Sequence, residues 1–184
     1  MRFLTLALCA AFASFILFFG QTMAQIVVPT KLNVELRDLT KEARTEIECL
    51  AQNIYFEAAK EPREGQIAVA HVTRNRMISG KYPSTYCGVV KQKTDGVCQF
   101  SWFCEQRAKA IVNKKGLTPD NNLLYNNIVD LSLNFYLNPE DYEDASKGAL
   151  FYHADYVNPT WNNMKRTAYI GRHIFYNRVK QRNI

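Results

Sequence analysis

Histidine is scarce in this sequence, and the spacings typical of zinc sites are absent. The 184 residues include three histidines, His71, His153 and His173, and none of them belongs to an HExxH-like motif. The segment CQFSWFC (98–104) separates its cysteines by more than the two residues of a CxxC pair. Zinc ligands commonly recur at these two spacings. Zinc held by the cysteines is the alternative, but we expect no metal and no cofactor.

Internal repeats, low-complexity tracts and linkers are also absent, which favours a single domain for a chain of this length. The start of the chain differs from the rest. A basic residue precedes an uncharged apolar run at 3–20, and the small residues TMA follow it. This order is typical of a secretory signal. We expect a signal peptide at 1–24, an extended leader at 25–40 and the folded domain at 41–184, with an uncleaved membrane anchor as the alternative for the first segment.

Cysteine usage is consistent with export. Cys9 would leave with the signal, so four cysteines remain. An even number in an exported chain suggests two disulfides, for which three pairings exist. The short spacing favours a bridge between Cys98 and Cys104, and Cys49 would then pair with Cys87.

The charge balance is modestly basic. The chain has 23 Lys and Arg against 17 Asp and Glu, a net charge of +6. Removing Arg2 with the signal leaves +5, which suits an anionic partner such as a bacterial envelope polymer. Nucleic acid is disfavoured, because the basic clusters at 91–93 and 113–115 are too short for an interaction tail. The sequence predicts no oligomeric state.

Hydrophobic periodicity predicts mostly helices, followed by strands. Thr40 is a candidate N-cap, and the proline at 62 separates the first helix from the second. The IGRH stretch (170–173) is expected to turn a hairpin. We expect helices at 40–59, 63–77, 105–114 and 121–137, loops at 79–88 and 98–104, and strands within 148–154 and 167–179. The predicted fold class is therefore α+β, mainly helical, with a small antiparallel sheet near the C-terminus.

One acidic side chain lies beside the apolar stripe of the first helix. At about 100° per residue, Glu57 falls about 20° from Leu50, at the edge of the stripe that contains Ile54. It is also in the last helical turn, where the helix dipole disfavours an anion. Partial burial and the dipole both raise the pKa of a carboxyl group. A carboxylic acid that keeps its proton near neutral pH can act as a general acid.

A structural role for Glu57 is the alternative. In that reading it ties two helices together through an ion pair with Lys60, Arg63 or Arg74. Two neighbouring acids, Glu61 and Glu64, are expected to be structural, because Glu61 precedes a proline and Glu64 suits the first turn of the next helix.

Several stretches together resemble one family. YFEAAKEPREGQIAVAHVTRNR (55–76) resembles the signature of SleB/CwlJ-type cell wall hydrolases, in which a Glu-Ala pair precedes GEP.EGQ.AVA.V..NR. YPSTYCGVVKQ (82–92) and CQFSW (98–102) resemble two further family segments, and GALFYHADYVNPTW (148–161) and IGRHIFY (170–176) resemble its closing strands. The matches follow the family's order over nearly the whole expected mature chain.

The resemblance implies a lysozyme-like fold and cleavage of the peptidoglycan glycan strand, with Glu57 as the catalytic acid. It implies either hydrolysis or attack by the sugar's own 6-hydroxyl, and we favour the second, a lytic transglycosylase, because the motifs supply one obvious catalytic carboxylate. The chain departs from the family at Ala59-Lys60, where Arg-Gly is usual, which could alter the pKa tuning of the acid. The four cysteines resemble those of Gram-negative members, which implies the periplasm.

Substrate contacts are expected from the aromatic loop and the first predicted strand, because aromatic rings pack on sugar faces and polar groups bind acetamido groups. The residues concerned are Gln99, Phe100, Ser101, Tyr152 and His153. A core position is the alternative for Phe100 and Tyr152, and Trp102 and Trp161 could serve either purpose.

Two rival functions remain at this stage. A zinc-dependent N-acetylmuramoyl-L-alanine amidase would cut the peptide stem, but this sequence lacks the ligand spacing that such a zinc site needs. A non-catalytic peptidoglycan-binding protein would share the fold without turnover. In each case the expected partner is peptidoglycan, and a membrane is contacted through the N-terminal segment alone.

Overall fold

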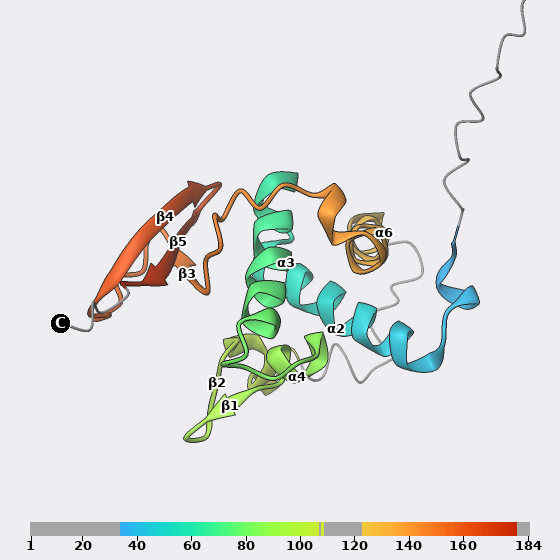
Figure 1. Cartoon of the computed structure of the whole chain (residues 1–184), viewed down its shortest axis with the longest axis horizontal. Coiled ribbons are helices and arrows are strands. Elements are labelled where there is room, and N and C mark those ends of the chain that lie inside the picture. The colour runs from blue at the N-terminus through green and yellow to red at the C-terminus, as the bar shows by residue number, and fades with distance from the viewer. Residues whose placement is uncertain (1–33, 107, 109–122, 180–184) are drawn as a thin grey trace, which may run out of the picture. The chain divides into compact units, whose positions relative to one another are not determined.

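Two α-helices packed against each other form the centre of the described structure (Figure 1). The computed structural model describes residues 34–106, 108 and 123–179, and these residues belong to one compact unit. In chain order the elements are η1 (Leu36–Asp38), α2 (Lys41–Ala58), α3 (Arg63–Ile78), α4 (Tyr86–Val90), β1 (Lys93–Thr94), β2 (Val97–Cys98), η2 (Ser101–Phe103), α6 (Leu123–Leu137), η3 (Pro139–Asp141), β3 (Phe151–Ala154), β4 (Met164–Ile170) and β5 (His173–Arg178).

The two central helices begin where the sequence predicts. The Thr40 hydroxyl accepts a hydrogen bond of 3.2 Å from the backbone N–H of Ala43, which caps α2. The helix ends at Ala58, and Pro62 is the N-cap residue of α3. Both helix predictions are confirmed to within one residue at each end.

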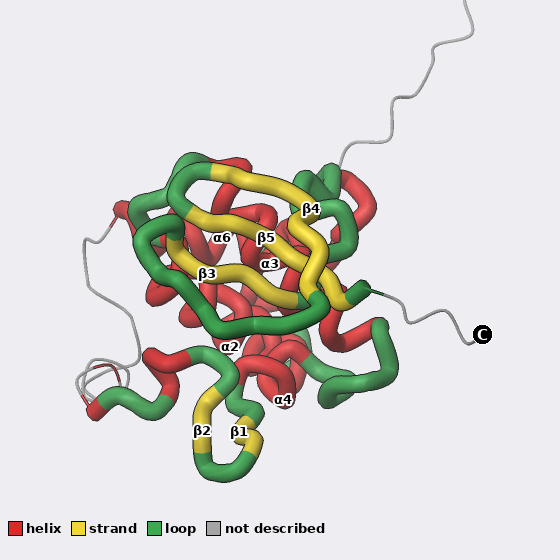
Figure 2. The backbone as a smooth tube through the Cα atoms, turned by 90° about the vertical axis from the view of Figure 1, so that its left-hand side faces the viewer, coloured by secondary structure: helices red, strands yellow, loops and turns green. Residues whose placement is uncertain are grey.

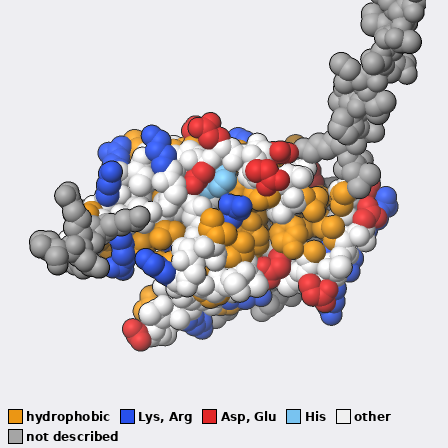
Figure 3. Space-filling view, viewed as in Figure 1, with side chains coloured by type: hydrophobic (Ala, Val, Ile, Leu, Met, Phe, Trp, Pro, Cys, Tyr) orange, Lys and Arg blue, Asp and Glu red, His pale blue; other side chains and the backbone are white. Residues whose placement is uncertain are grey.

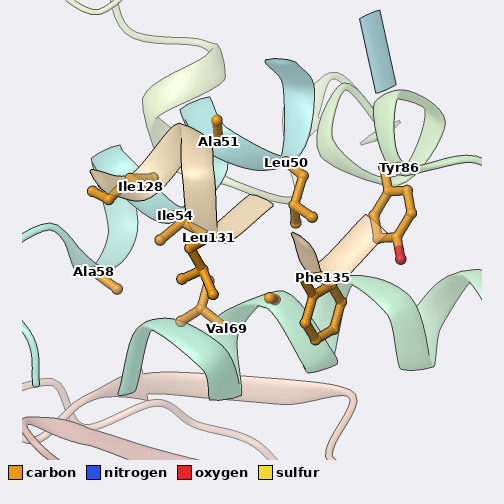
Figure 4. Close-up of a cluster of buried hydrophobic side chains, with 10 residues drawn as sticks. Leu50, Ala51, Ile54, Ala58, Val69, Tyr86, Ile128, Leu131 and Phe135 are labelled. Atoms are coloured by element: carbon orange, nitrogen blue, oxygen red, sulfur yellow. The ribbon is translucent and has the colours of Figure 1, made fainter. Parts of the chain in front are cut away.

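The main core lies between α2, α3 and α6 (Figure 4). Leu50 and Ile54 of α2, Val69 of α3, and Ile128 and Leu131 of α6 are fully buried. Each such side chain stabilises the fold by roughly 1.5–3 kcal/mol through removal of apolar surface from water. This packing fixes the rotation of α2, so the residues at the edge of its apolar stripe are held beside the core.

The C-terminal sheet has the strand order β3-β5-β4, and both pairs are antiparallel. One face packs on α3, where Ala68 and Val72 contact Ile170 and Phe175. Figure 2 views the molecule from the sheet side, with the helices behind the strands. Together with the helices, this sheet confirms the predicted α+β class.

The β4–β5 hairpin turns at 170–173 as expected. Gly171 has a φ of +57° and lies against the Glu61 carboxylate, so an added side chain would clash there. The turn therefore needs glycine for both its backbone conformation and its packing.

Both favoured disulfides are present. Cys49–Cys87 joins α2 to α4 across 38 positions, and Cys98–Cys104 closes a loop across six. Loop-closure entropy gives about 4 kcal/mol for the first bridge and about 2 kcal/mol for the second. The bridge with the larger contribution, Cys49–Cys87, anchors α2, the helix that contains Glu57.

Two local predictions differ from the structure. The leader was expected to be extended, but Leu36–Asp38 form a 3₁₀ turn, because the Asp38 carboxylate accepts a hydrogen bond of 3.1 Å from the Glu35 N–H. The loop expected at 79–88 ends early, since Thr85 caps α4 by accepting a hydrogen bond from Gly88 N–H.

Other expectations fall outside the described residues. These are the signal peptide at 1–24 and most of the helix predicted at 105–114. Within the described part, no helix is long and apolar enough to cross a membrane.

Candidate active site

Glu57 lies in the last turn of α2, and its carboxyl group meets a side chain from the sheet. The Tyr152 hydroxyl of β3 donates a hydrogen bond of 3.0 Å to Glu57 Oε2. The two residues are 95 positions apart. Tyr152 points toward the helices because it shares a sheet face with its β5 partner Phe175, and this face packs on α3. The fold thus places a hydroxyl donor on the acid that the sequence singled out.

The alternative in which Glu57 ties two helices by an ion pair is not what the structure shows. Within the described ranges, no ion pair joins Glu57 to Lys60, Arg63 or Arg74. Arg63 instead donates a hydrogen bond of 3.4 Å to the Asn127 carbonyl. The Glu57 carboxyl group is therefore not neutralised by any of these three cations.

Burial raises the pKa of Glu57 to about 7. The residue keeps some exposure, yet its carboxyl group lies in a largely buried environment that disfavours the charged form. The Tyr152 hydrogen bond and the positive charge of Arg76 lower the pKa, and the nearby Glu105 carboxylate raises it further. Burial outweighs the two favourable contacts. The direction agrees with the expectation from the helix wheel.

Arg76 of α3 is a site neighbour that the sequence reasoning missed. Its guanidinium is buried, Nε donates a hydrogen bond of 2.8 Å to the Leu150 carbonyl, and it lies 5.0 Å from the centre of the Phe100 ring. Nη1 is buried and bonds to no described residue. The signal was available, because Arg76 follows Val69 and Val72 at helical spacing on the buried face of α3.

Tyr152 is held firmly in place. Its ring packs against His173, with centroids 5.1 Å apart, and against Phe175 at 5.6 Å. Burial raises the pKa of the Tyr152 hydroxyl well above its usual range, so it remains a donor. Burial also lowers the pKa of His173, which keeps that imidazole neutral at physiological pH. The supporting residues thus hold the donor without adding a competing charge.

The two acids expected to be structural behave as such. Glu61 Oε2 accepts a hydrogen bond of 2.8 Å from the Arg172 N–H, so it ties the α2–α3 connection to the β4–β5 turn. Glu64 is exposed in the first turn of α3.

The two buried rings of the aromatic loop pack in the core and do not line the site. Phe100 and Trp102 are buried in a cluster with Val89 and Val90 of α4. The Trp102 indole N–H donates a hydrogen bond of 3.0 Å to Asn53 Oδ1 of α2. Phe100 was expected to contact substrate, but its buried ring has no open face for a sugar. A core position, which was the alternative, describes both Phe100 and Trp102.

The polar residues of the same loop lie nearer the surface. Gln99 donates a hydrogen bond of 3.3 Å to the Thr94 hydroxyl across the β1–β2 hairpin, and Ser101 is exposed. Neither forms a described contact with Glu57.

His153 follows Tyr152 directly but faces the other way. Side chains alternate between the two faces of a strand, and His153 stacks on Tyr176 with centroids 5.2 Å apart. Its Nε2 lies 3.2 Å from the Tyr176 hydroxyl. The structure therefore separates two neighbouring residues that the sequence assigned to one site.

The histidines of the described residues are also candidate metal ligands. His71 lies in the core with Nε2 3.0 Å from the Tyr142 carbonyl oxygen. Among the described residues no group of three or more His, Cys, Asp or Glu is placed to hold a metal ion.

Comparison with known proteins follows this geometry. A family model described as Cell Wall Hydrolase matches residues 60–176, beginning three residues after Glu57. The chain is 33% identical over 89 residues to a spore cortex-lytic enzyme of Oceanobacillus iheyensis, covering 45% of this chain and 32% of that protein. It is 44% identical over 48 residues to one of Bacillus subtilis, covering 26% and 16%. The matched parts thus span less than a third of these relatives' length.

A solved structure extends the match to most of the chain. The catalytic domain of the germination-specific lytic transglycosylase SleB from Bacillus anthracis aligns with a TM-score of 0.50 and 26% identity. The alignment covers 73% of this chain and 95% of that domain. The lysozyme-like arrangement of helices with a small antiparallel sheet is thus shared. With the family model matching well over half of its residues, this chain belongs to the cell wall hydrolase family.

Proposed function

We propose that this chain degrades peptidoglycan by cleaving the glycan strand between N-acetylmuramic acid and N-acetylglucosamine, with Glu57 as the general acid. The observation that carries the proposal is a partly buried carboxyl group with a pKa of about 7, oriented by the Tyr152 hydroxyl. The solved domain it resembles is named a lytic transglycosylase, and the sequence relatives are named spore cortex-lytic enzymes.

The mechanism follows from the protonation state of Glu57. The protonated carboxyl group donates its proton to the glycosidic oxygen as the bond to the muramic acid C1 breaks, and the sugar acquires oxocarbenium character. The Tyr152 hydrogen bond holds Oε2 in place and stabilises the carboxylate left behind. That carboxylate then accepts a proton from the nucleophile that attacks C1, which restores the acid for the next cycle.

The nucleophile decides the product. We favour the 6-hydroxyl of the muramic acid itself, which gives a 1,6-anhydro sugar, over water. The second carboxylate near Glu57 is Glu105, an exposed side chain beyond the Cys98–Cys104 loop. No described contact holds Glu105 rigidly enough to activate a water. Mass spectrometry of the fragments separates the routes, because the anhydro product is lighter by one water.

The decisive experiment replaces the acid without changing its shape. Glu57→Gln should lower the rate of digestion of purified peptidoglycan by about 10²–10⁴-fold, because general acid catalysis contributes that much. In the unmodified chain the rate should fall as pH rises above about 7, where Glu57 loses its proton. The matched control is Glu64→Gln, the same change at an exposed position. A folded Glu57→Gln protein with near-normal turnover would refute the assignment.

Export of the chain to the cell envelope also belongs to this proposal. A substrate in the cell wall requires an extracytoplasmic enzyme, and two disulfides suit an oxidising compartment. We favour the periplasm, on the family resemblance of the four cysteines.

A further inference from the structure

Two cavities lie against the face of the sheet that points away from α3, and a third lies at the end of the sheet, where Ser79, Lys81 and Tyr82 of the segment after α3 help to line it. One cavity of about 460 Å³ is lined by His153, Trp161 and Tyr176, among others. A second of about 390 Å³ includes Trp161, Phe151 and Arg178, and a third of about 640 Å³ includes Phe151 and Arg178 again. Neighbouring cavities share lining residues, so they adjoin one another along a strip of surface, called here the outer-face groove. Glu57 lines none of the three.

Aromatic rings form the middle of this outer-face groove. Trp161 is 42% exposed although its ring contacts three others, with centroids 6.0 Å from Phe151, 5.5 Å from His153 and 5.9 Å from Tyr176. Exposed polar side chains such as Asn163 lie beside it. A flat, partly exposed indole flanked by amides matches a sugar ring, which has apolar C–H faces and polar edges.

One end of the groove is positively charged. Lys81, Lys165 and Arg178 line the 640 Å³ cavity, and none of the described residues that line it is acidic. The Arg178 guanidinium lies 5.5 Å from the centre of the Phe151 ring, so the aromatic and basic parts are in contact. Figure 3 shows basic side chains gathered over the part of the surface formed by the sheet. Such an end attracts carboxylates.

We propose that the outer-face groove is a second, non-catalytic peptidoglycan site, in which the glycan strand stacks on Trp161 and the carboxylates of its peptide stems approach Lys165 and Arg178. The proposal rests on the proposed function for the identity of the polymer. Peptidoglycan combines uncharged sugar rings with carboxylate-bearing peptides, which is the combination of chemistries that the groove presents.

The pleat of β3 separates the groove from the Glu57 site. Tyr152 turns toward Glu57, whereas the next residue, His153, contacts Tyr176 and Trp161 of the groove. Two sites on opposite faces can hold different stretches of one insoluble polymer, which raises the local concentration of cleavable bonds at Glu57.

Binding of the full chain to purified peptidoglycan sacculi tests this directly. Co-sedimentation is measured in a Glu57→Gln background, so that the polymer is not cut. Trp161→Ala should weaken binding by about tenfold, as for an aromatic residue at the centre of a binding surface. Val97→Ala, at an exposed apolar position on the β1–β2 hairpin, is the control.

Reversing the charge of two basic residues tests the charged end of the groove. Lys165→Glu with Arg178→Glu should weaken binding to whole sacculi, with the loss reduced at high salt. The same pair should bind normally to glycan strands stripped of their peptides, whereas Trp161→Ala should be impaired on both polymers. Lys93→Glu, an exposed residue of β1, controls for a change of charge alone.

The outcomes separate this proposal from the proposed function. With Glu57 intact, the groove variants should digest a short soluble glycan fragment at the normal rate. Normal binding of sacculi by Trp161→Ala and by the charge-reversed pair would refute the second site. Slow turnover of the soluble fragment by Trp161→Ala would also refute it, because Trp161 would then serve the catalytic site. If the unmodified chain neither binds nor cuts sacculi, the proposed function fails as well.

Discussion

The two faces of strand β3 provide environments of opposite character. On the face toward the helices, Tyr152 is enclosed by His173 and Phe175 and bonds to Glu57. On the outer face, His153 lies between Tyr176 and the exposed Trp161 and lines a cavity. Two consecutive residues therefore lie in different environments.

The difference follows from what each face packs against. The helix-facing side is largely buried, so it can raise the pKa of a carboxyl group and hold a single donor in place. The outer side remains open, so it suits contact with a large polymer. A reaction that needs a protonated acid belongs on the first side, and polymer capture can use the second.

The strongest test of this contrast compares two tyrosines. Tyr152→Phe removes the hydrogen bond to Glu57 and should lower turnover about 10–100-fold, because the acid loses its orientation. The same change should raise the pKa of Glu57, since the Tyr152 hydroxyl lowers it in the native protein. The pH–rate profile would then extend to higher pH.

Tyr176→Phe is the matched control on the outer face, where the hydroxyl contacts His153 instead. It should leave the rate on a soluble fragment unchanged. Equal effects of the two substitutions would mean that the faces are not functionally distinct.

A smaller effect concerns stability. Folded Glu57 has a pKa of about 7 against an ordinary value of 4.5, so the folded state binds this proton more tightly than the unfolded state. The free energy of unfolding therefore decreases as pH rises from about 4.5 to 7. Glu57→Gln removes this loss and should raise Tm at pH 8 by a few degrees relative to the unmodified chain.

At pH 4 the advantage of Glu57→Gln should disappear, because the native acid is then protonated in the folded state. Differential scanning calorimetry at both pH values provides the measurement. Glu64→Gln, at an exposed position, should show no comparable gain. A stability gain for Glu57→Gln that is the same at both pH values would contradict the raised pKa.

The smallest expected effect is on the outer face. His153→Ala removes one ring from the aromatic cluster and should slow digestion of sacculi by about threefold, within the range of a single aromatic contact. Turnover of a short soluble fragment should not change. A large loss on that fragment would place His153 at the catalytic site, as the sequence alone had suggested.

Much of the framework could be predicted from local patterns. Thr40 and Pro62 mark the starts of two helices, and the IGRH turn marks the hairpin, because capping and turn chemistry depend on neighbouring residues. Glu57 could be chosen because a wheel places it at the edge of an apolar stripe, and edge positions are partly buried in any fold that buries the stripe.

The contacts around Glu57 were not predicted in the same way. Arg76 was overlooked, although its helical spacing placed it on the buried face of α3. Phe100 was expected to meet a sugar, but its ring fills a cluster under the basic side chain of Arg76. In each case the environment depends on elements that are distant in the sequence.

The sequence by itself determined the two central helices, the hairpin, the family motifs and the choice of Glu57 as the candidate acid, because short-range periodicity and turn chemistry are sufficient for them. Only the tertiary structure decided that Tyr152 is the donor to Glu57 and that His153 faces a separate groove. Those outcomes depend on how the pleat of β3 is rotated relative to α2 and α3, and that rotation is set by packing of the whole core.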